Sequence, residues 1–402
     1  MMKELVKYEF RKIWTKLTVV SVISFIVVST ILNCIAFFNS PIGITSDGNQ
    51  VKGIKSFRAI KNQSKDIEGE VNGEYLQNLI KNFNSSTEKQ EFGDIMGYEL
   101  TKYKFSNLII NYANYGPATM TNMLGLDFKF LDSEEEFYNQ YKKSVGEHIK
   151  IDSKKNWFQY TDKQMDKINQ KIDKLETPFI VDYYEGLEYF IWQYSEQFLF
   201  VFIVIAFALS SLFSKDSNNG IDELTLSSKF GRKKNMNARI IAGNIFAVIV
   251  YALFIATLSI EIGAVASFGG WNQSIQNIWY TCLYNISAGE GILIMILQGL
   301  IGVIIIANII MLISIKFKYS KVSTILSLAS IWMIERLTYT SNSIQLQLNP
   351  LYYAKSNISS SIYYFIGDII LPYVLVFIGV AAIYMIIIRF FTVRQYRRYK
   401  LN

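Results

Sequence analysis

Residues 17–38 read LTVVSVISFIVVSTILNCIAFF and contain no charged side chain. An α-helix needs about 20 mostly apolar residues to cross about 30 Å of hydrocarbon, so this stretch predicts a membrane-spanning helix. It is longer than the apolar run of a cleaved signal peptide, and no small-residue cleavage site follows it at Phe38-Asn39-Ser40-Pro41. We therefore expect the segment to stay in the protein as its first span.

Further apolar stretches follow at about residues 198–213, 240–268, 291–315, 322–333 and 369–388. The first of these could begin earlier, near Tyr189, which would place Glu196 at the interface. The stretch before Glu335 and Arg336 is the shortest, and it spans only if those two side chains reach the headgroups. Pro372 would kink the first turns of the last span. The predicted fold is an all-α membrane protein with six transmembrane helices.

The basic residues predict the orientation of these spans. The short flanks carry 19 Lys and Arg against five acids, whereas the long segment 39–196 carries 19 basic residues and 24 acids. These flanks are residues 1–16, 214–239, 316–321 and 389–402. Because short basic flanks stay in the cytoplasm, we expect a multi-pass protein of the cell membrane with both termini cytoplasmic. The long segment is then extracytoplasmic.

The segment 39–196 holds 43 of the 73 charged side chains and is expected to fold as a mostly helical domain. Ser133-Glu134-Glu135-Glu136 and Thr161-Asp162-Lys163-Gln164 both fit the capping box that begins a helix. After Thr161, an apolar stripe runs until Pro178, and we interpret it as core, with a docking face as the alternative. The stripe consists of Met165, Ile168, Ile172 and Leu175.

Aromatic residues are dense where this segment meets the second span. They are typical of a membrane-interface belt, although they could also line a substrate entrance. The seven residues are Phe179, Tyr183, Tyr184, Tyr189, Phe190, Trp192 and Tyr194. The expected division is residues 1–38 as an interfacial helix and first span, 39–196 as the extracellular domain, and 197–402 as five further spans.

The sequence lacks the motifs of common enzyme classes. It has no phosphate-binding P-loop, no G-x-S-x-G elbow, no H-E-x-x-H pair and no C-x-x-C. Its single histidine, His148, and its two cysteines, Cys34 and Cys282, do not supply the ligands of a zinc site. We expect no catalytic residue, no metal and no cofactor on this chain, and no nucleic-acid partner.

Polar side chains inside the expected spans often mark function, because they are costly in lipid. Glu261 fits a position at the outer headgroups, and a proton relay is the alternative. Asn244, Gln298 and Asn308 are neutral, and we expect them to hydrogen-bond between helices.

The loop between the second and third spans resembles that of ABC-2 type permeases, the membrane subunits of ATP-binding cassette transporters. The family places an acid, a glycine, a leucine-rich turn, a hydroxyl pair and an arginine there, at positions matched by Asp216, Gly220, Leu224, Leu226, Ser227, Ser228 and Arg232. The start, Met1 to Lys16, is similar to the family's interfacial elbow helix, with Leu5, Tyr8 and Trp14 among basic residues. Asn349-Pro350-Leu351 is similar to its outer re-entrant region.

The resemblance implies a separate cytoplasmic ATPase subunit that binds ATP, a second permease subunit in a homo- or heterodimer, and the lipid bilayer as surroundings. Segment 214–239 would be the coupling loop. Leu224, Leu226 and Phe230 would enter an apolar groove of the ATPase, and Asp222, Glu223 and Arg232 would fix orientation by charge. The alternative is a basic loop held at anionic headgroups.

The extracellular domain of about 158 residues departs from compact members of the family. This favours export or membrane clearance of a hydrophobic peptide, such as an antimicrobial peptide, or of a lipid-like compound, as is common among such permeases in Gram-positive bacteria. The alternative from another class is a non-transporting membrane sensor or assembly protein with a ligand-binding extracellular domain. A permease of another fold with fewer spans is a third possibility.

Overall fold

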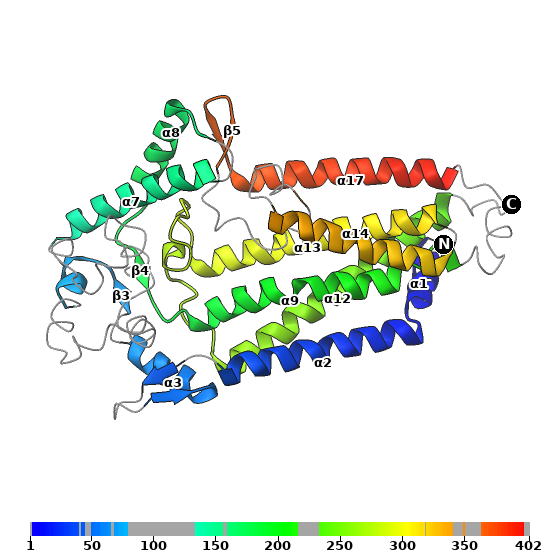
Figure 1. Ribbon diagram of the computed structural model, residues 1–402, viewed down its shortest axis with the longest axis horizontal. Helices are drawn as coiled ribbons and strands as arrows, with labels where there is room; N and C mark the ends of the chain where they lie inside the picture. Colours follow the sequence, from blue (N-terminus) through cyan, green and yellow to red (C-terminus); the bar gives the residue numbers. More distant parts are fainter. Residues whose placement is uncertain are drawn as a thin grey trace.

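The computed structural model describes residues 2–39, 42–44, 50–65, 68–78, 133–155, 159–215, 233–317, 319–340, 349 and 363–397. These residues form a bundle of long helices (Figure 1). Helix α1 and the C-terminal end of α17 lie at one end of the bundle, here called the terminal end (Figure 1). The shorter helices and hairpins gather at the opposite end and form what we call the cap.

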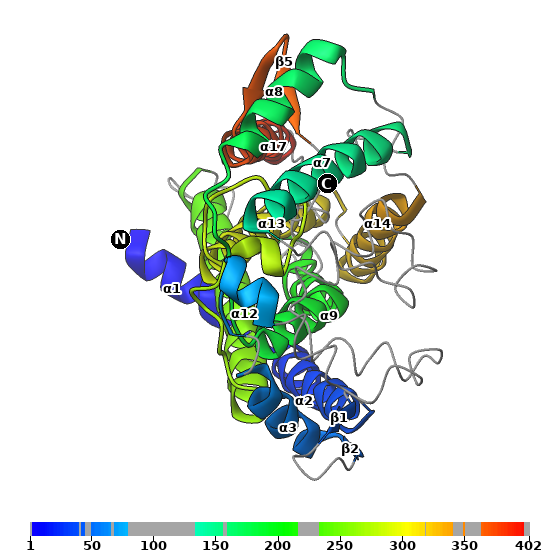
Figure 2. The same cartoon turned by 90° about the vertical axis from the view of Figure 1, so that its left-hand side faces the viewer.

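Five described helices are long and apolar enough to cross a membrane. They coincide with five of the predicted spans, and they are α2 (Lys16–Asn39), α9 (Glu185–Leu209), α12 (Lys233–Val265), α13 (Ala288–Lys316) and α17 (Tyr373–Arg397). Helices α9, α12 and α13 form the interior, while α2 and α17 lie at opposite edges (Figures 1 and 2). The structure therefore supports a multi-pass, mostly helical membrane protein.

The weakest predicted span corresponds to helix α14 (Ser320–Thr340), which packs against α9 and α13. The helix is longer than the apolar stretch and continues through Glu335 and Arg336. It is not among the helices that are apolar enough to cross a membrane. The count of six spans accordingly stays a prediction.

Helix α1 (Met2–Ile13) lies beside the terminal end of the bundle, against α12 (Figure 2). Its boundary with α2 is set by Thr15, whose Oγ1 accepts from the backbone N–H of Thr18 at 3.2 Å. Trp14, at this corner, meets the ring of Phe246 edge-on with centroids 5.4 Å apart. The corner therefore anchors the amphipathic helix that the sequence predicts to the interior of the bundle.

Among its described residues, the cap contains three helices, a short 3₁₀ turn and three two-stranded antiparallel sheets. The helical elements are α3 (Ile54–Ser64), α7 (Glu134–Lys155), α8 (Asp162–Asp173) and η4 (Ile275–Asn277). Two of the sheets are hairpins, β1 (Ile42–Ile44) with β2 (Gln50–Lys52) and β5 (Tyr364–Ile366) with β6 (Ile369–Leu371). The third pairs the remote strands β3 (Gly69–Glu70) and β4 (Ile180–Val181).

Both predicted helix starts occur in the cap. Thr161 and Gln164 form the reciprocal capping box at α8, and Ser133 Oγ accepts from the N–H of Glu136 at 3.1 Å before α7. The stripe that follows Thr161 packs inward, because Ile168 and Ile172 are buried in the apolar cluster of the cap. The interpretation of this stripe as core is confirmed.

The apolar cluster of the cap is assembled from three parts of the chain. Phe137 and Tyr141 come from α7, Tyr280 and Leu283 from the connection between α12 and α13, and Tyr363 from the segment before β5. The hydroxyl of Tyr141 donates to the carbonyl of Tyr280 at 2.6 Å. Two connections between helices of the bundle therefore complete the core of the 39–196 segment.

The last helix starts later than predicted. Residues Ile369–Leu371 form strand β6 instead of a first helical turn, and α17 begins at Tyr373. The carbonyl of Pro372 accepts from the N–H groups of Leu375 and Val376 at 3.0 and 3.3 Å. Because proline lacks an N–H and tolerates a helix start, Pro372 precedes the helix and does not kink it, which corrects the expectation.

Candidate functional site

The predicted coupling residues lie outside the described residues, in the segment 216–232. They are Asp222, Glu223, Leu224, Leu226, Phe230 and Arg232. The structure describes the chain on both sides, up to Lys215 after α9 and from Lys233 at the start of α12. The two attachment points of the segment therefore lie at the terminal end (Figure 1).

The chain after α9 is held by hydroxyl side chains of two neighbouring helices. Ser314 of α13 accepts, through its Oγ, from the backbone N–H groups of Phe213 and Ser214 at 3.0 and 3.4 Å. Ser210 and Thr324 of α14 share a hydrogen bond of 2.7 Å between their hydroxyls. The Ser314 hydroxyl thus pairs two backbone N–H groups of the turn after α9, and the Ser210–Thr324 contact joins the end of α9 to α14.

An ion pair joins the start of α12 to α1. Arg239 Nε lies 3.3 Å from Glu9 Oε2, and the Nζ of Lys12 lies 3.3 Å from Glu9 Oε1. Glu9 and Arg239 are only 3% and 4% exposed. Charges buried this deeply are costly unless they are paired, so removal of Arg239 would leave the buried Glu9 with Lys12 as its remaining cation among the described residues.

The same arginine reaches the end of α9. Its Nη1 donates to the carbonyl of Leu212 at 3.4 Å, and its guanidinium lies 5.3 Å from the ring centroid of Phe213. Phe213 in turn meets Tyr396 of α17 edge-on at 5.9 Å. We call Glu9, Arg239, Phe213, Ser314 and Tyr396 the terminal junction. It connects α1, α9, α12, α13 and α17 next to both attachment points of residues 216–232.

A second constellation lies within the bundle, nearer the cap. Gln197 Nε2 donates to Asn33 Oδ1 at 2.6 Å and to Gln193 Oε1 at 2.7 Å, and its Oε1 accepts from Ser29. Thr30 Oγ1 donates to Glu261 Oε1 at 2.5 Å, and Asn33 Nδ2 donates to Glu261 Oε2. We call these six residues the bundle polar cluster. It links α2, α9 and α12.

This cluster defines the surroundings of Glu261. The residue is half-buried and its carboxylate turns toward α2, where both oxygens accept hydrogen bonds. Asn308 Nδ2 likewise donates to Asn244 Oδ1 at 2.8 Å, as expected for a contact between helices. Gln298 is 2% exposed, and neither polar atom of its side chain has a hydrogen-bond partner in the described part of the chain.

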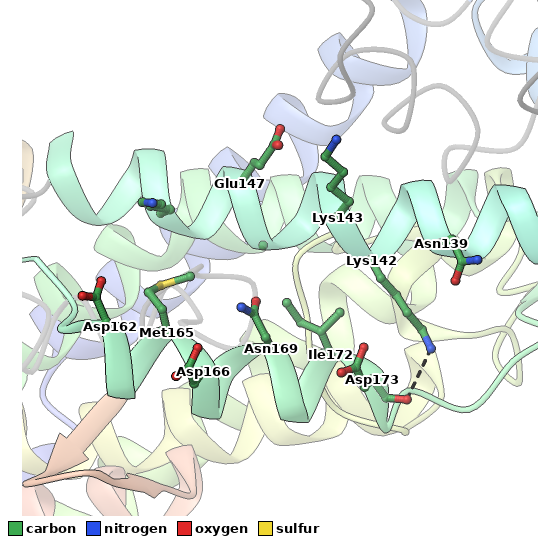
Figure 3. A pocket seen from close by; sticks show the side chains of 12 residues that line it. Asn139, Lys142, Lys143, Glu147, Asp162, Met165, Asp166, Asn169, Ile172 and Asp173 are labelled. Atoms are coloured by element: carbon green, nitrogen blue, oxygen red, sulfur yellow. Dashed lines mark hydrogen bonds between the residues drawn. The ribbon is translucent and has the colours of Figure 1, made fainter.

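A surface cleft of about 660 Å³ separates α7 from α8 in the cap (Figure 3). Lys142 points across it and its Nζ donates to the carbonyl of Asp173 at 3.3 Å, while Lys143 and Glu147 point away from α8 (Figure 3). Asp162 and Asp166 carry further acidic groups on the α8 side. The cleft has the size of a small-ligand pocket, and it lies in the domain that the sensor hypothesis assigns to ligand binding.

The aromatic residues at the junction of cap and bundle face inward. All but one of the seven are buried, and only Trp192 is largely exposed, at 49%. Tyr183 donates its hydroxyl to the carbonyl of Ala266 at 2.8 Å. The group therefore packs the cap onto the bundle, and Trp192 alone has the exposure that a membrane belt requires.

Burial shifts the pKa values of several groups in the cap, among them a thiol and a fully buried tyrosine. It raises the pKa of the Cys282 thiol to about 12, and it raises the pKa of Tyr141 well above its usual value. Both groups are therefore neutral at physiological pH. Among the described residues, no three His, Cys, Asp or Glu side chains are grouped so as to hold a metal ion.

Sequence reasoning missed the terminal junction. Glu9 and Arg239 are 230 positions apart, and the one available signal is that Glu9 is an acid on a mostly basic helix. No protein-family model, curated protein or solved structure matches the chain.

Proposed function

We propose that this chain is the membrane subunit of an ATP-binding cassette transporter. It would couple ATP hydrolysis by a separate ATPase subunit to export or membrane clearance of a hydrophobic peptide or lipid-like substrate. The observation that carries the proposal is the terminal junction, which ties both attachment points of segment 216–232 to α1, α13 and α17.

Coupling requires that a push on a loop becomes movement of helices. If the helix ends that flank the loop were loosely packed, a force on the loop would move only those ends and not the rest of the bundle. Here Arg239 contacts both Glu9 and the carbonyl of Leu212, so the helices that flank the loop are joined to each other and to α1. A force on residues 216–232 would therefore reach several helices together.

The ATPase contact is assigned to Leu224, Leu226 and Phe230, with Asp222, Glu223 and Arg232 giving orientation. The test is purification of the tagged chain in mild detergent, followed by measurement of nucleotide hydrolysis by any copurified ATPase. We expect Leu224→Asp with Leu226→Asp to abolish copurification. Replacement of Asn218 and Asn219 by alanine, in the same loop, is the matched control and should preserve it.

The cleft between α7 and α8 supports the sensor as a second candidate. One experiment distinguishes the transporter from the sensor, because only the transporter needs an ATPase. Retention of ligand response in cells that lack every partner ATPase would favour the sensor. Dependence of the response on the leucines of the loop would favour the transporter.

A further inference from the structure

We propose that a groove between α12 and α17 binds an anionic phospholipid of the surrounding bilayer, in the leaflet at the terminal end. This proposal depends on the membrane placement of the bundle and not on the transporter function. The groove measures about 620 Å³. Its lining residues are Ile240, Asn244, Asn308, Met385, Ile386, Arg389, Phe390 and Thr392.

The groove arises because α12 and α17 pack on different sides of α13. Ile305 of α13 is buried against Ala381 and Ile388 of α17, whereas α12 contacts α13 through its own face. The hydrogen-bonded pair Asn308 and Asn244 is part of its lining, together with Thr392, which is 3% exposed. Two amide groups and a hydroxyl therefore line a space whose α17 wall carries the exposed side chains of Ile386 and Phe390.

The side chains on the walls of the groove are apolar, which suits the acyl chains of a lipid. Ile386 and Phe390 of α17 are 68% and 60% exposed, and Ile240 contributes the α12 side. Apolar side chains exposed over the length of a span face hydrocarbon, so an acyl chain is their expected neighbour.

The end of the groove is cationic. Arg389 is exposed, and its Nη2 donates to Asn237 Oδ1 of α12 at 2.6 Å. A guanidinium has five N–H donors, and Asn237 takes one of them. In the part of the chain that the structure describes, Arg389 forms no ion pair with a carboxylate. A cation near hydrocarbon favours an anionic partner, and a guanidinium matches the geometry of a phosphate.

The position of Arg389 along α17 agrees with a place at the lipid headgroups. Arg389 lies eight residues before the described end of α17, and Asn308 lies eight residues before the end of α13. At 1.5 Å per residue these are about 12 Å from the helix ends, and Arg389 is the first charged side chain after the apolar stretch of α17, where the helix leaves the hydrocarbon for the headgroups. Phosphate at Arg389 and acyl chains along Ile386 would fit one lipid molecule.

The test is native mass spectrometry of the purified chain, titrated with phosphatidylglycerol or with phosphatidylcholine. We expect one preferred phosphatidylglycerol, bound about five- to tenfold more weakly after Arg389→Ala. The matched control is Arg394→Ala, on the same helix but outside the groove, which should bind as the parent does. Ile386→Trp, an exposed position that tolerates a larger side chain, should reduce binding by filling the groove.

Four results would overturn the proposal. One is equal affinity for the two lipids, and another is equal loss with Arg389→Ala and Arg394→Ala. The third is displacement of the lipid by millimolar inorganic phosphate, which would show a site for a small anion. If Ile386→Cys instead forms a disulfide between two copies in the membrane, the groove is an interface between protomers and the lipid assignment is wrong.

Discussion

The cap and the bundle are held together by different kinds of polar contact. In the cap, tyrosine hydroxyls donate to backbone carbonyls of remote segments, as from Tyr138 to Val71 at 2.8 Å and from Tyr363 to Thr281 at 2.9 Å. In the bundle, amide, carboxylate and guanidinium side chains contact one another, as in Glu261 with Asn33 and in Glu9 with Arg239.

The difference follows from the surroundings. A tyrosine in the cap gains from leaving water, and its hydroxyl adds direction to an apolar contact. A helix in lipid gains little from apolar packing against another helix, because lipid tails are equally apolar. Specific polar contacts therefore decide which helices of the bundle stay together. Substitutions in the cap should accordingly weaken its apolar packing, and substitutions in the bundle should weaken the association between its helices.

The largest effect is expected in the cap. Tyr141→Ala removes a fully buried ring that packs against Phe179 and Tyr280, and it should destabilise the cap by about 3–5 kcal/mol. The measurement is trypsin resistance of α7 during heating of the detergent-solubilised protein. Tyr141→Phe keeps the ring and should cost only about 1 kcal/mol for the lost hydrogen bond. Equal losses in the two variants would contradict an apolar origin of cap stability.

Arg239→Met tests the terminal junction. It leaves the buried Glu9 with Lys12 as its remaining cation, and we expect a loss of up to about 3 kcal/mol in the free energy of unfolding. Thermal unfolding in detergent provides the measurement, and the double variant with Glu9→Gln should recover part of the loss. Absence of coupling between the two substitutions would show that the ion pair does not join α1 to α12.

Gln197→Leu tests the bundle polar cluster. It removes three hydrogen bonds and should weaken association of α2 with α9 by about 1–2 kcal/mol, because contacts of this kind are individually modest in membranes. Unfolding in mixed micelles of dodecyl sulfate reports the change. Ser21→Ala is the control, since that hydroxyl bonds only within its own helix. A similar loss in the control would refute a special role for the cluster.

The smallest effect concerns Cys282, which should resist alkylation at pH 8. The thiol is 1% exposed, and burial raises its pKa to about 12, so little thiolate is present. Unfolding in dodecyl sulfate should restore the reaction, which mass spectrometry of the peptide can follow. Rapid alkylation of the native protein would show that the cap opens around this residue.

Much of the fold could be predicted from the sequence because its signals are local. The apolar runs of α2 and α13 are long and free of charge, and Thr161 with Gln164 sets a helix start within four residues. Contacts between distant segments have no such signal. Nothing near Tyr280 indicates that it completes the core beside Tyr141, and β6 was predicted as helix because a three-residue apolar strand has no distinguishing period.

The candidate site likewise has one part that the sequence predicts and one part that only the structure reveals. A family resemblance carried the prediction of Leu224 and Leu226, which lie outside the described residues and stay predictions. The buried pair of Glu9 and Arg239 depends on how α1 packs against α12, which no local pattern reveals. The structure thus adds the anchorage of the loop, while the sequence supplies the hypothesis of what the loop contacts.

The most direct test of the proposed coupling is photo-cross-linking in intact cells. A photoreactive amino acid would replace Leu226 in the loop at the terminal end or, as the control, Ile366 in the exposed hairpin of the cap. We predict that position 226 cross-links to a protein with a nucleotide-binding P-loop and that position 366 does not. Cross-linking of position 226 only to lipid, with no ATPase captured, would contradict the proposed coupling.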